Sequence, residues 1–294
     1  MTSMVITPLT DKVFGAVVTN VHLADINESA FAEIHAAFLE YGFLVFPKQF
    51  LTEQQNIEFG ERFGELEFGG LPLANQKKQK DGSYGVVIDL NHQRMRTNLG
   101  NEAWHTDSTY MPLASKAAML TAVILPPENG ETEFADMRAA WEALTPERQA
   151  ALEGLEASHS LFHSQGKSGY QHAQGDGYGL HDLGAPRRAI VKVHPETGRK
   201  SIYTGRHAYG VSGMSDEESE ALLTRLLEDA CQPPRTYLHR WDVGDTVVWD
   251  NRCMMHRARP YDPSYPRTLR GSRIAGDPSS ELAATVTDKF AAAQ

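Results

Sequence analysis

The sequence has little cysteine and no long hydrophobic stretch. Its 294 residues include only two cysteines, Cys231 and Cys253. Two are too few for a disulfide framework or a cysteine-based zinc site, which favours a reducing compartment. No apolar run approaches the ~20 residues that span a bilayer. The first residues also lack a charged segment followed by a continuous apolar one, so we expect no signal peptide and a cytoplasmic location.

Positive charge is also scarce. Lysine and arginine number 28 against 38 aspartate and glutamate residues, a net charge of −10. Proteins that fill DNA grooves or lie on anionic membranes need an excess of basic residues, so we expect neither nucleic-acid nor membrane partners. The rest of the composition is that of an ordinary folded protein, with 41% hydrophobic and 22% charged residues. Without a repeat or a linker, it indicates a single domain over residues 1–294.

Short strands with a few helices dominate the pattern. Helices are predicted over 27–41, 52–64 and 215–231, and a further one from Thr145-Pro146. Strands are predicted at 43–46, 84–90, 117–125, 190–194, 200–203, 236–241, 246–249 and 267–275. This order predicts a mainly β fold with peripheral helices, either a β-sandwich or a jelly-roll barrel.

The stretch from 66 to 100 has no regular pattern. Gly69-Gly70 and the basic run 76–82 predict a long exposed loop around one short strand. Loops of this length inside compact domains are usually functional covers or disordered. We therefore expect a lid over a binding site, with the lysines of the run forming a solvated face.

Two polar clusters could supply metal ligands. His105 and Asp107 stand two apart, so on an extended chain both side chains point to one face. Together they would supply two ligands of a 2-His-1-carboxylate triad that suits Fe(II), although a surface turn explains the same tripeptide. His256 follows the apolar strand at 246–249, where it is either a ligand or a buried structural histidine. Downstream, Arg267 could clamp a carboxylate through paired N–H donors.

These motifs follow one another in a familiar order. They are Trp104-His105-Thr106-Asp107, Gly130-Glu131-Thr132, Trp249-Asp250-Asn251-Arg252-Cys253-Met254-Met255-His256 and the downstream Arg267. From about residue 5 to 276 the chain resembles the taurine dioxygenase / 2,4-D dioxygenase (TauD/TfdA) family. The resemblance is strongest to the bacterial aryloxyalkanoate dioxygenases that act on (S)-2-phenoxypropionates and 2,4-D (2,4-dichlorophenoxyacetate). It implies a double-stranded β-helix (jelly-roll) core and an Fe(II)- and 2-oxoglutarate-dependent oxygenase.

The resemblance also implies roles for single residues. The iron ligands would be His105, Asp107 and His256. Thr132 and Arg267 would bind the distal carboxylate of 2-oxoglutarate, and Asn101 would line the cosubstrate pocket. The implied cofactors are Fe(II), 2-oxoglutarate as cosubstrate and O2. The implied reaction hydroxylates the ether-bearing carbon of a small anionic aromatic substrate and releases a phenol, glyoxylate or pyruvate, succinate and CO2.

One position departs from the family pattern. Many relatives carry a substrate-binding arginine four residues after the cosubstrate arginine, but this chain has Gly271 there. Strand alternation puts Arg273 on the face of Arg267 and turns Arg270 away, so we expect Arg273 to bind the substrate carboxylate. A surface ion pair is the alternative. A straight strand would place Arg273 roughly 20 Å beyond Arg267, so a twist or bulge must return it toward the iron.

Other functions stay open on the sequence alone. The same centre could oxidise a sulfonate, a sulfate ester or another small anion, because a fold and a metal centre do not fix the substrate. A non-catalytic module that binds metal or 2-oxoglutarate would not need Arg267 and Thr132 together with open iron positions. A cupin-type isomerase typically uses more histidines and no cosubstrate arginine. We also expect a homo-oligomer, and His207 beside Arg206 is a further candidate for the pocket.

Overall fold

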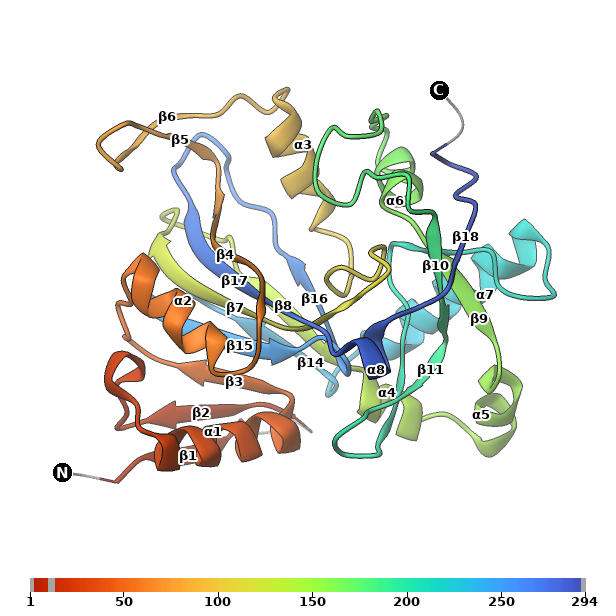
Figure 1. Cartoon of the computed structure of the whole chain (residues 1–294), viewed down its shortest axis with the longest axis horizontal. Helices are drawn as coiled ribbons and strands as arrows, with labels where there is room; N and C mark the ends of the chain where they lie inside the picture. Colours follow the sequence, from red (N-terminus) through yellow and green to blue (C-terminus); the bar gives the residue numbers. More distant parts are fainter. Residues whose placement is uncertain (1–2, 10–13, 292–294) are drawn as a thin grey trace.

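Two β-sheets pack face to face at the centre of the computed structural model, which describes residues 3–9 and 14–291 (Figure 1). The larger sheet runs β1 (Val5–Pro8), β2 (Ala16–Thr19), β3 (Phe43–Phe46), β15 (Thr246–Asp250), β7 (Ser115–Ile124), β17 (Thr268–Ala275), β4 (Leu66–Ala74). The smaller sheet runs β14 (Thr236–His239), β8 (Thr132–Asp136), β16 (Met254–Ala258). Two facing sheets with these strand orders form a jelly-roll core.

The larger sheet is apolar on both faces because both faces are covered. In β3, Phe43 points toward the smaller sheet, whereas Leu44 points toward helices α1 (Glu28–Tyr41) and α2 (Glu53–Glu61). In β15, Trp249 and Val248 divide in the same way. Figure 1 shows the two helices along that outer face. A strand covered on both sides reads as a continuous apolar run, which is the pattern that predicts a strand at 43–46.

Side-chain caps begin three of the helices. The side chain of Asn27 accepts from the Ala30 amide at 2.9 Å and begins α1. Capping boxes at Thr52 and Ser215 begin α2 and α7 (Asp216–Ala230). The helices predicted over 27–41, 52–64 and 215–231 are confirmed to within a few residues at each end. No helix in the described part of the chain is long and apolar enough to cross a bilayer.

A long insertion separates β8 from β14, which are neighbours in the smaller sheet. It contains α4 (Met137–Glu142), α5 (Pro146–Leu152), β9 (Glu156–His159), α6 (Leu161–Lys167), β10 (Ala185–Ala189), β11 (Val191–Val193), β12 (Lys200–Ile202), β13 (Ala208–Tyr209) and α7. Its apolar side chains, such as Trp141 and Leu226, pack with Met255 on the outer face of the smaller sheet. The predicted hairpin at 195–198 joins β11 to β12. After β17 follow α8 (Pro278–Glu281) and β18 (Thr285–Val286), which pairs with β10.

The segment from 66 to 100 is more regular than predicted. It holds β4, the hairpin of β5 (Gln76–Lys78) and β6 (Tyr84–Val87), and α3 (Gln93–Gly100). The expected loop over the first part of this segment is wrong because β4 pairs with β17 from the far end of the chain. Gly69, Gly70 and Pro72 interrupt the side-chain alternation that would otherwise mark a strand. That this segment moves as a lid stays a prediction.

Candidate active site

A single β-bridge brings two of the predicted metal ligands together. The His105 amide donates to the His256 carbonyl (3.0 Å), and the His256 amide donates to the His105 carbonyl (2.9 Å). Residues directly opposite in an antiparallel pair share a face, and the two ring centroids lie 4.2 Å apart. Oδ2 of Asp107 lies 3.8 Å from Nε2 of His256. One ligand atom from each of the three residues lies within 4.8 Å of the others.

Burial and neighbouring charges set these groups in metal-binding protonation states. Burial, helped by the second imidazole, lowers the pKa of His105 to about 3, and burial also lowers the pKa of His256, so both rings are neutral. Burial alone raises the pKa of Asp107, but the Arg273 guanidinium and both histidines outweigh it and hold the pKa below its usual value. His105 Nδ1 lies 2.8 Å from the Ala103 carbonyl, which leaves Nε2 for a metal. Two neutral imidazoles and one carboxylate are a donor set that fits Fe(II).

The bridge is supported from its other face by Trp104 and Arg257. These residues alternate with the two histidines, so their side chains lie behind the pocket. The Arg257 guanidinium carbon is 4.6 Å from the centre of the Trp104 ring, and Nε and Nη2 lie 2.8 and 2.7 Å from Oε2 of Glu133. Glu133 is opposite Arg257 in β8 and next to Thr132. These contacts therefore tie β16, which carries His256, to β8, which carries Thr132.

Arg267 is a buried cation that lacks an acidic partner. It is 8% exposed, and its Nε and Nη2 both donate to the Gly130 carbonyl, at 3.2 and 2.8 Å. Among the described residues no carboxylate lies within ion-pair distance of it, and burial lowers the pKa of its guanidinium. Gly130 has a φ of +77°, and a Cβ there would lie 3.1 Å from Arg267 Nε. An ionised, half-satisfied guanidinium in a dry site is the arrangement expected of an anion pocket.

Thr132 and Asn101 lie close to this pocket along the backbone. Thr132 follows Gly130 by two residues, is 3% exposed, and its Oγ1 accepts from Trp241 Nε1 at 3.1 Å, which leaves its own proton for a ligand. The Asn101 carbonyl accepts from the Ala258 amide at 2.8 Å, and Ala258 is opposite Thr132 in β8. The two predicted cosubstrate residues are thus one strand apart.

Arg273 reaches the metal cluster through an irregularity in its strand. The register between β17 and β4 shifts between Gly271 and Arg273, which supplies the bulge that the prediction required. Arg273 Nη2 donates to Oδ1 of Asp107 at 3.0 Å, and Nη1 donates to Ser108 Oγ at 3.2 Å. Arg270 points elsewhere, because its Nη1 donates to the Leu51 carbonyl. Arg273 therefore lies against the His-Asp-His cluster, with one edge of its guanidinium paired with Asp107.

Arg206 is a site residue that the sequence did not single out. It is partly buried, and burial lowers its pKa to about 10. Its Nη2 donates to the Ser164 carbonyl at 3.1 Å, and within the described residues no carboxylate lies at ion-pair distance. The neighbouring His207 ring is 6.1 Å from the His105 ring, and its Nδ1 lies 2.8 Å from Ser164 Oγ. No sequence motif marks Arg206; in the structure its guanidinium packs against Gly100, where a Cβ would lie 2.2 Å from Nη1.

A second group of metal-binding residue types, at His194, Asp250 and Cys253, is structural. Asp250 accepts from Nε and Nη2 of Arg252 at 2.8 and 2.7 Å, and its Oδ2 is also 3.0 Å from Nε2 of His194. Both carboxylate oxygens are therefore occupied by a buried ion pair. This network fixes the turn between β15 and β16 and so holds the strand that carries His256.

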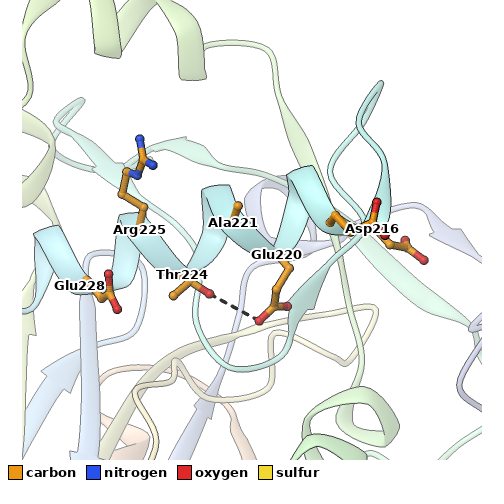
Figure 2. A pocket seen from close by; sticks show the side chains of 7 residues that line it. Asp216, Glu220, Ala221, Thr224, Arg225 and Glu228 are labelled. Atoms are coloured by element: carbon orange, nitrogen blue, oxygen red, sulfur yellow. Dashed lines mark hydrogen bonds between the residues drawn. The ribbon is translucent and has the colours of Figure 1, made fainter.

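A shallow groove along α7 lies apart from these residues (Figure 2). Glu220, Thr224 and Glu228 line it, and Thr224 Oγ1 donates to Glu220 Oε1 at 3.4 Å. None of its lining residues belongs to the His-Asp-His cluster, and Arg206, Arg267 and Arg273 do not line it. A row of acidic side chains on the exposed face of an amphipathic helix is an ordinary solvated surface.

Comparison with known proteins agrees with this geometry. The family described as "Taurine catabolism dioxygenase TauD, TfdA family" matches residues 6–273. An (S)-phenoxypropionate/alpha-ketoglutarate-dioxygenase from Sphingobium herbicidovorans is 50% identical and covers 95% of this chain and 97% of its own. An alpha-ketoglutarate-dependent 2,4-dichlorophenoxyacetate dioxygenase from Cupriavidus pinatubonensis is 37% identical, with 94% and 99% covered. The crystal structure of AAD-2 in complex with Mn(II) and N-oxalylglycine has a TM-score of 0.88 at 35% identity and covers 97% of this chain and 100% of its own.

The geometry predicts that loss of His256 removes divalent metal binding. His256→Ala deletes one of three protein ligands, and we expect the affinity for Mn(II) to fall by at least about tenfold to a hundredfold, as losses around metal sites usually do. Mn(II) titration followed by electron paramagnetic resonance measures this directly. His181→Ala, outside the cluster, is the control, and unchanged thermal unfolding shows that the fold survives. Tight stoichiometric Mn(II) binding by His256→Ala would refute the ligand set.

Proposed function

Because the chain belongs to the TauD/TfdA dioxygenase family, and is on that ground an Fe(II)- and 2-oxoglutarate-dependent dioxygenase, we propose that its substrate is an aryloxyalkanoate of the 2,4-D or phenoxypropionate type. One observation supports this most. Arg273 contacts Asp107 of a buried His-Asp-His cluster, and Arg267, which has no carboxylate at ion-pair distance among the described residues, binds the Gly130 carbonyl just before β8, the strand that pairs with the strand of His256. Two anions would pair with these two arginines beside one metal. One is a dicarboxylate, the cosubstrate, and the other is a monocarboxylate, the substrate.

His105, Asp107 and His256 are the residues we propose as iron ligands. Bound Fe(II) supplies the activation of O2 at the expense of 2-oxoglutarate, which leaves as succinate and CO2. The protein's own contribution is geometric. The β-bridge fixes the spacing of the imidazoles, Ala103 fixes the tautomer of His105, and Arg273 orients Asp107.

Arg267 and Thr132 are the proposed binding site for the distal carboxylate of 2-oxoglutarate. The Arg267 guanidinium keeps N–H donors beyond those given to Gly130, and the Thr132 hydroxyl keeps its proton because Oγ1 accepts from Trp241. Together these donors would hold the far end of the cosubstrate and leave its oxo acid end toward the metal cluster. Asn101 would border the same pocket.

Arg273 is the proposed partner of the substrate carboxylate. With that carboxylate held beside Asp107, the adjacent ether carbon would face the metal. Iron, when bound, would supply the oxidation, in which one oxygen atom of O2 would be inserted into the C–H bond of that carbon and the other would leave in succinate. The hydroxylated ether collapses to a phenol with glyoxylate, or with pyruvate from a propionate. We also propose that the segment from 66 to 100 covers the substrate and that the chain forms a homo-oligomer.

The proposed function is tested by a substrate panel. Purified protein with Fe(II), O2 and 2-oxoglutarate is offered 2,4-dichlorophenoxyacetate, both enantiomers of a 2-phenoxypropionate, taurine and an alkyl sulfate, and succinate and phenol release are measured. We expect equal amounts of succinate and phenol with an aryloxyalkanoate. Turnover of only the sulfonate or sulfate ester, or of none of the panel, would contradict the proposed substrate class.

Loss of Arg267 should weaken 2-oxoglutarate specifically. Truncating a charge pair in a buried site costs about 2–5 kcal/mol, so Arg267→Ala should raise the apparent KM for 2-oxoglutarate by at least about 30-fold. Arg225→Ala, on the exposed face of α7, is the matched control. Steady-state succinate release at varied 2-oxoglutarate gives the constants. An unchanged KM in Arg267→Ala would mean that the cosubstrate is anchored elsewhere.

Loss of Arg273 should act on the substrate instead. Arg273→Ala is expected to raise the KM for 2,4-dichlorophenoxyacetate by at least about tenfold, because it removes one partner of a charge pair, and to change that for 2-oxoglutarate by a smaller factor, because Arg267 remains. Arg270→Ala, whose side chain faces away, is the control. Cleavage of the phenoxy acid with an unchanged KM would remove Arg273 from this role and favour Arg206.

A further inference from the structure

Segments that are far apart in the sequence meet beside Arg273. Glu67 comes from β4, Ser108 follows the ligand Asp107, and Tyr178 comes from the loop between α6 and β10. The Arg273 guanidinium carbon is 5.0 Å from the centre of the Phe68 ring and 5.7 Å from that of Tyr178. The guanidinium thus lies in an aromatic-walled corner at the open edge of the metal cluster.

Glu67 is the unexpected member of this group, because it brings a second carboxylate to the arginine proposed for the substrate. Its Oε1 accepts from the Tyr178 hydroxyl, and its Oε2 accepts from Ser108 Oγ at 2.9 Å. From Oε2 to Arg273 Nε the distance is 3.9 Å, longer than a hydrogen bond. By contrast, Asp107 pairs with Arg273 at 3.0 Å. Glu67 is therefore held next to the guanidinium without forming a hydrogen-bonded pair with it.

The position of Tyr178 is built into its loop. Its ring packs edge-on to the Phe68 ring, with centroids 5.1 Å apart and planes at 80°. Glycines flank it on both sides, and Gly179 has a φ of +84°. A Cβ at Gly179 would lie 2.3 Å from the Tyr110 ring, so only glycine permits this approach. The residue itself is 40% exposed, which places it at the mouth of the site.

We propose that Tyr178 is a positioning residue that holds Glu67 away from Arg273 and thereby keeps one edge of the guanidinium open for the carboxylate of an incoming anionic substrate. This inference rests on the proposed function for the kind of ligand. Its physical basis is competition. Bidentate carboxylate–arginine pairs are strong, so Glu67 would turn both of its oxygens toward that edge if the Tyr178 hydroxyl did not hold Oε1. Substrate binding would then require displacing it.

The variant Tyr178→Phe tests this, because it removes the hydroxyl and keeps the ring. A crystal structure should show Glu67 moved to within hydrogen-bond distance of Arg273 Nε. In protein loaded with Mn(II) and N-oxalylglycine, calorimetry should give a dissociation constant for 2,4-dichlorophenoxyacetate raised on the order of tenfold, as expected when a buried anion competes for one cation. The KM for 2-oxoglutarate should not change. Tyr41→Phe, at the end of α1, is the matched control.

The double variant Tyr178→Phe with Glu67→Gln separates positioning from direct contact. An uncharged amide does not compete for the guanidinium, so this variant should regain the affinity that Tyr178→Phe loses. Continued weak binding would show that the phenol contacts substrate directly and would overturn the proposal. A crystal structure of Tyr178→Phe in which Glu67 has not moved would also overturn the proposal, independently of which substrate the enzyme uses. Failure of wild-type protein to bind any aryloxyalkanoate, with Glu67 moved as expected, would instead overturn the proposed substrate class.

Discussion

The active site depends on two backbone hydrogen bonds between His105 and His256. They join His105, which lies in a loop, to His256 in β16, the strand that follows the buried strand β15. Both bonds are made by backbone atoms alone. Once formed, they leave little freedom in the spacing of the two imidazoles, because opposite residues of an antiparallel pair share a face. The third residue of the cluster and its support are arranged around this bridge. Asp107 reaches the rings from two residues downstream, and Trp104 with Arg257 closes the opposite face.

Charge is distributed unevenly around this bridge. Arg273 pairs with the Asp107 carboxylate and has Glu67 close by, whereas Arg267 donates to the Gly130 carbonyl, faces the Tyr261 ring and has no carboxylate at ion-pair distance in the described part of the chain. Burying a cation is costly unless an anion compensates it. The desolvation of Arg267 is therefore not compensated by a carboxylate among the described residues. That of Arg273 is largely compensated by Asp107. The two anionic ligands of the proposed reaction therefore face different competition. 2-Oxoglutarate would meet an arginine with no carboxylate beside it, whereas the substrate would meet an arginine that already pairs with Asp107.

The sequence predicted those parts of the molecule that depend on local rules. Apolar periodicity marks the helix over 27–41, the residues at Thr52 and Ser215 mark two further helix starts, and the run 43–46 marks a buried strand. Alternation alone put His105 and Asp107 on one face. The resemblance to the family supplied His256, Thr132 and Arg267, which spacing left ambiguous.

Other parts were beyond local rules because they arise from pairing across the whole chain. β4 is a strand only because β17 lies beside it, and its glycines hide the alternation. Glu67 and Tyr178 meet although more than a third of the chain separates them, with nothing in either neighbourhood to indicate it. Arg206 likewise becomes notable only when its surroundings show that it lacks an acidic partner.

The insertion between β8 and β14 has an evolutionary consequence. It supplies Tyr178, Arg206 and His207, yet it leaves and re-enters the smaller sheet through two adjacent strands, so its internal changes need not disturb the bridge. Part of the surface around the proposed substrate therefore lies on a stretch of chain separate from the strands of the β-bridge, whereas Arg273 and Glu67 belong to β17 and β4. A lineage exposed to a new aromatic acid would adapt through selected changes in this stretch while purifying selection preserves the strands of the β-bridge. Divergence among relatives should then concentrate between residues 137 and 235, and the strands that hold the metal should change most slowly.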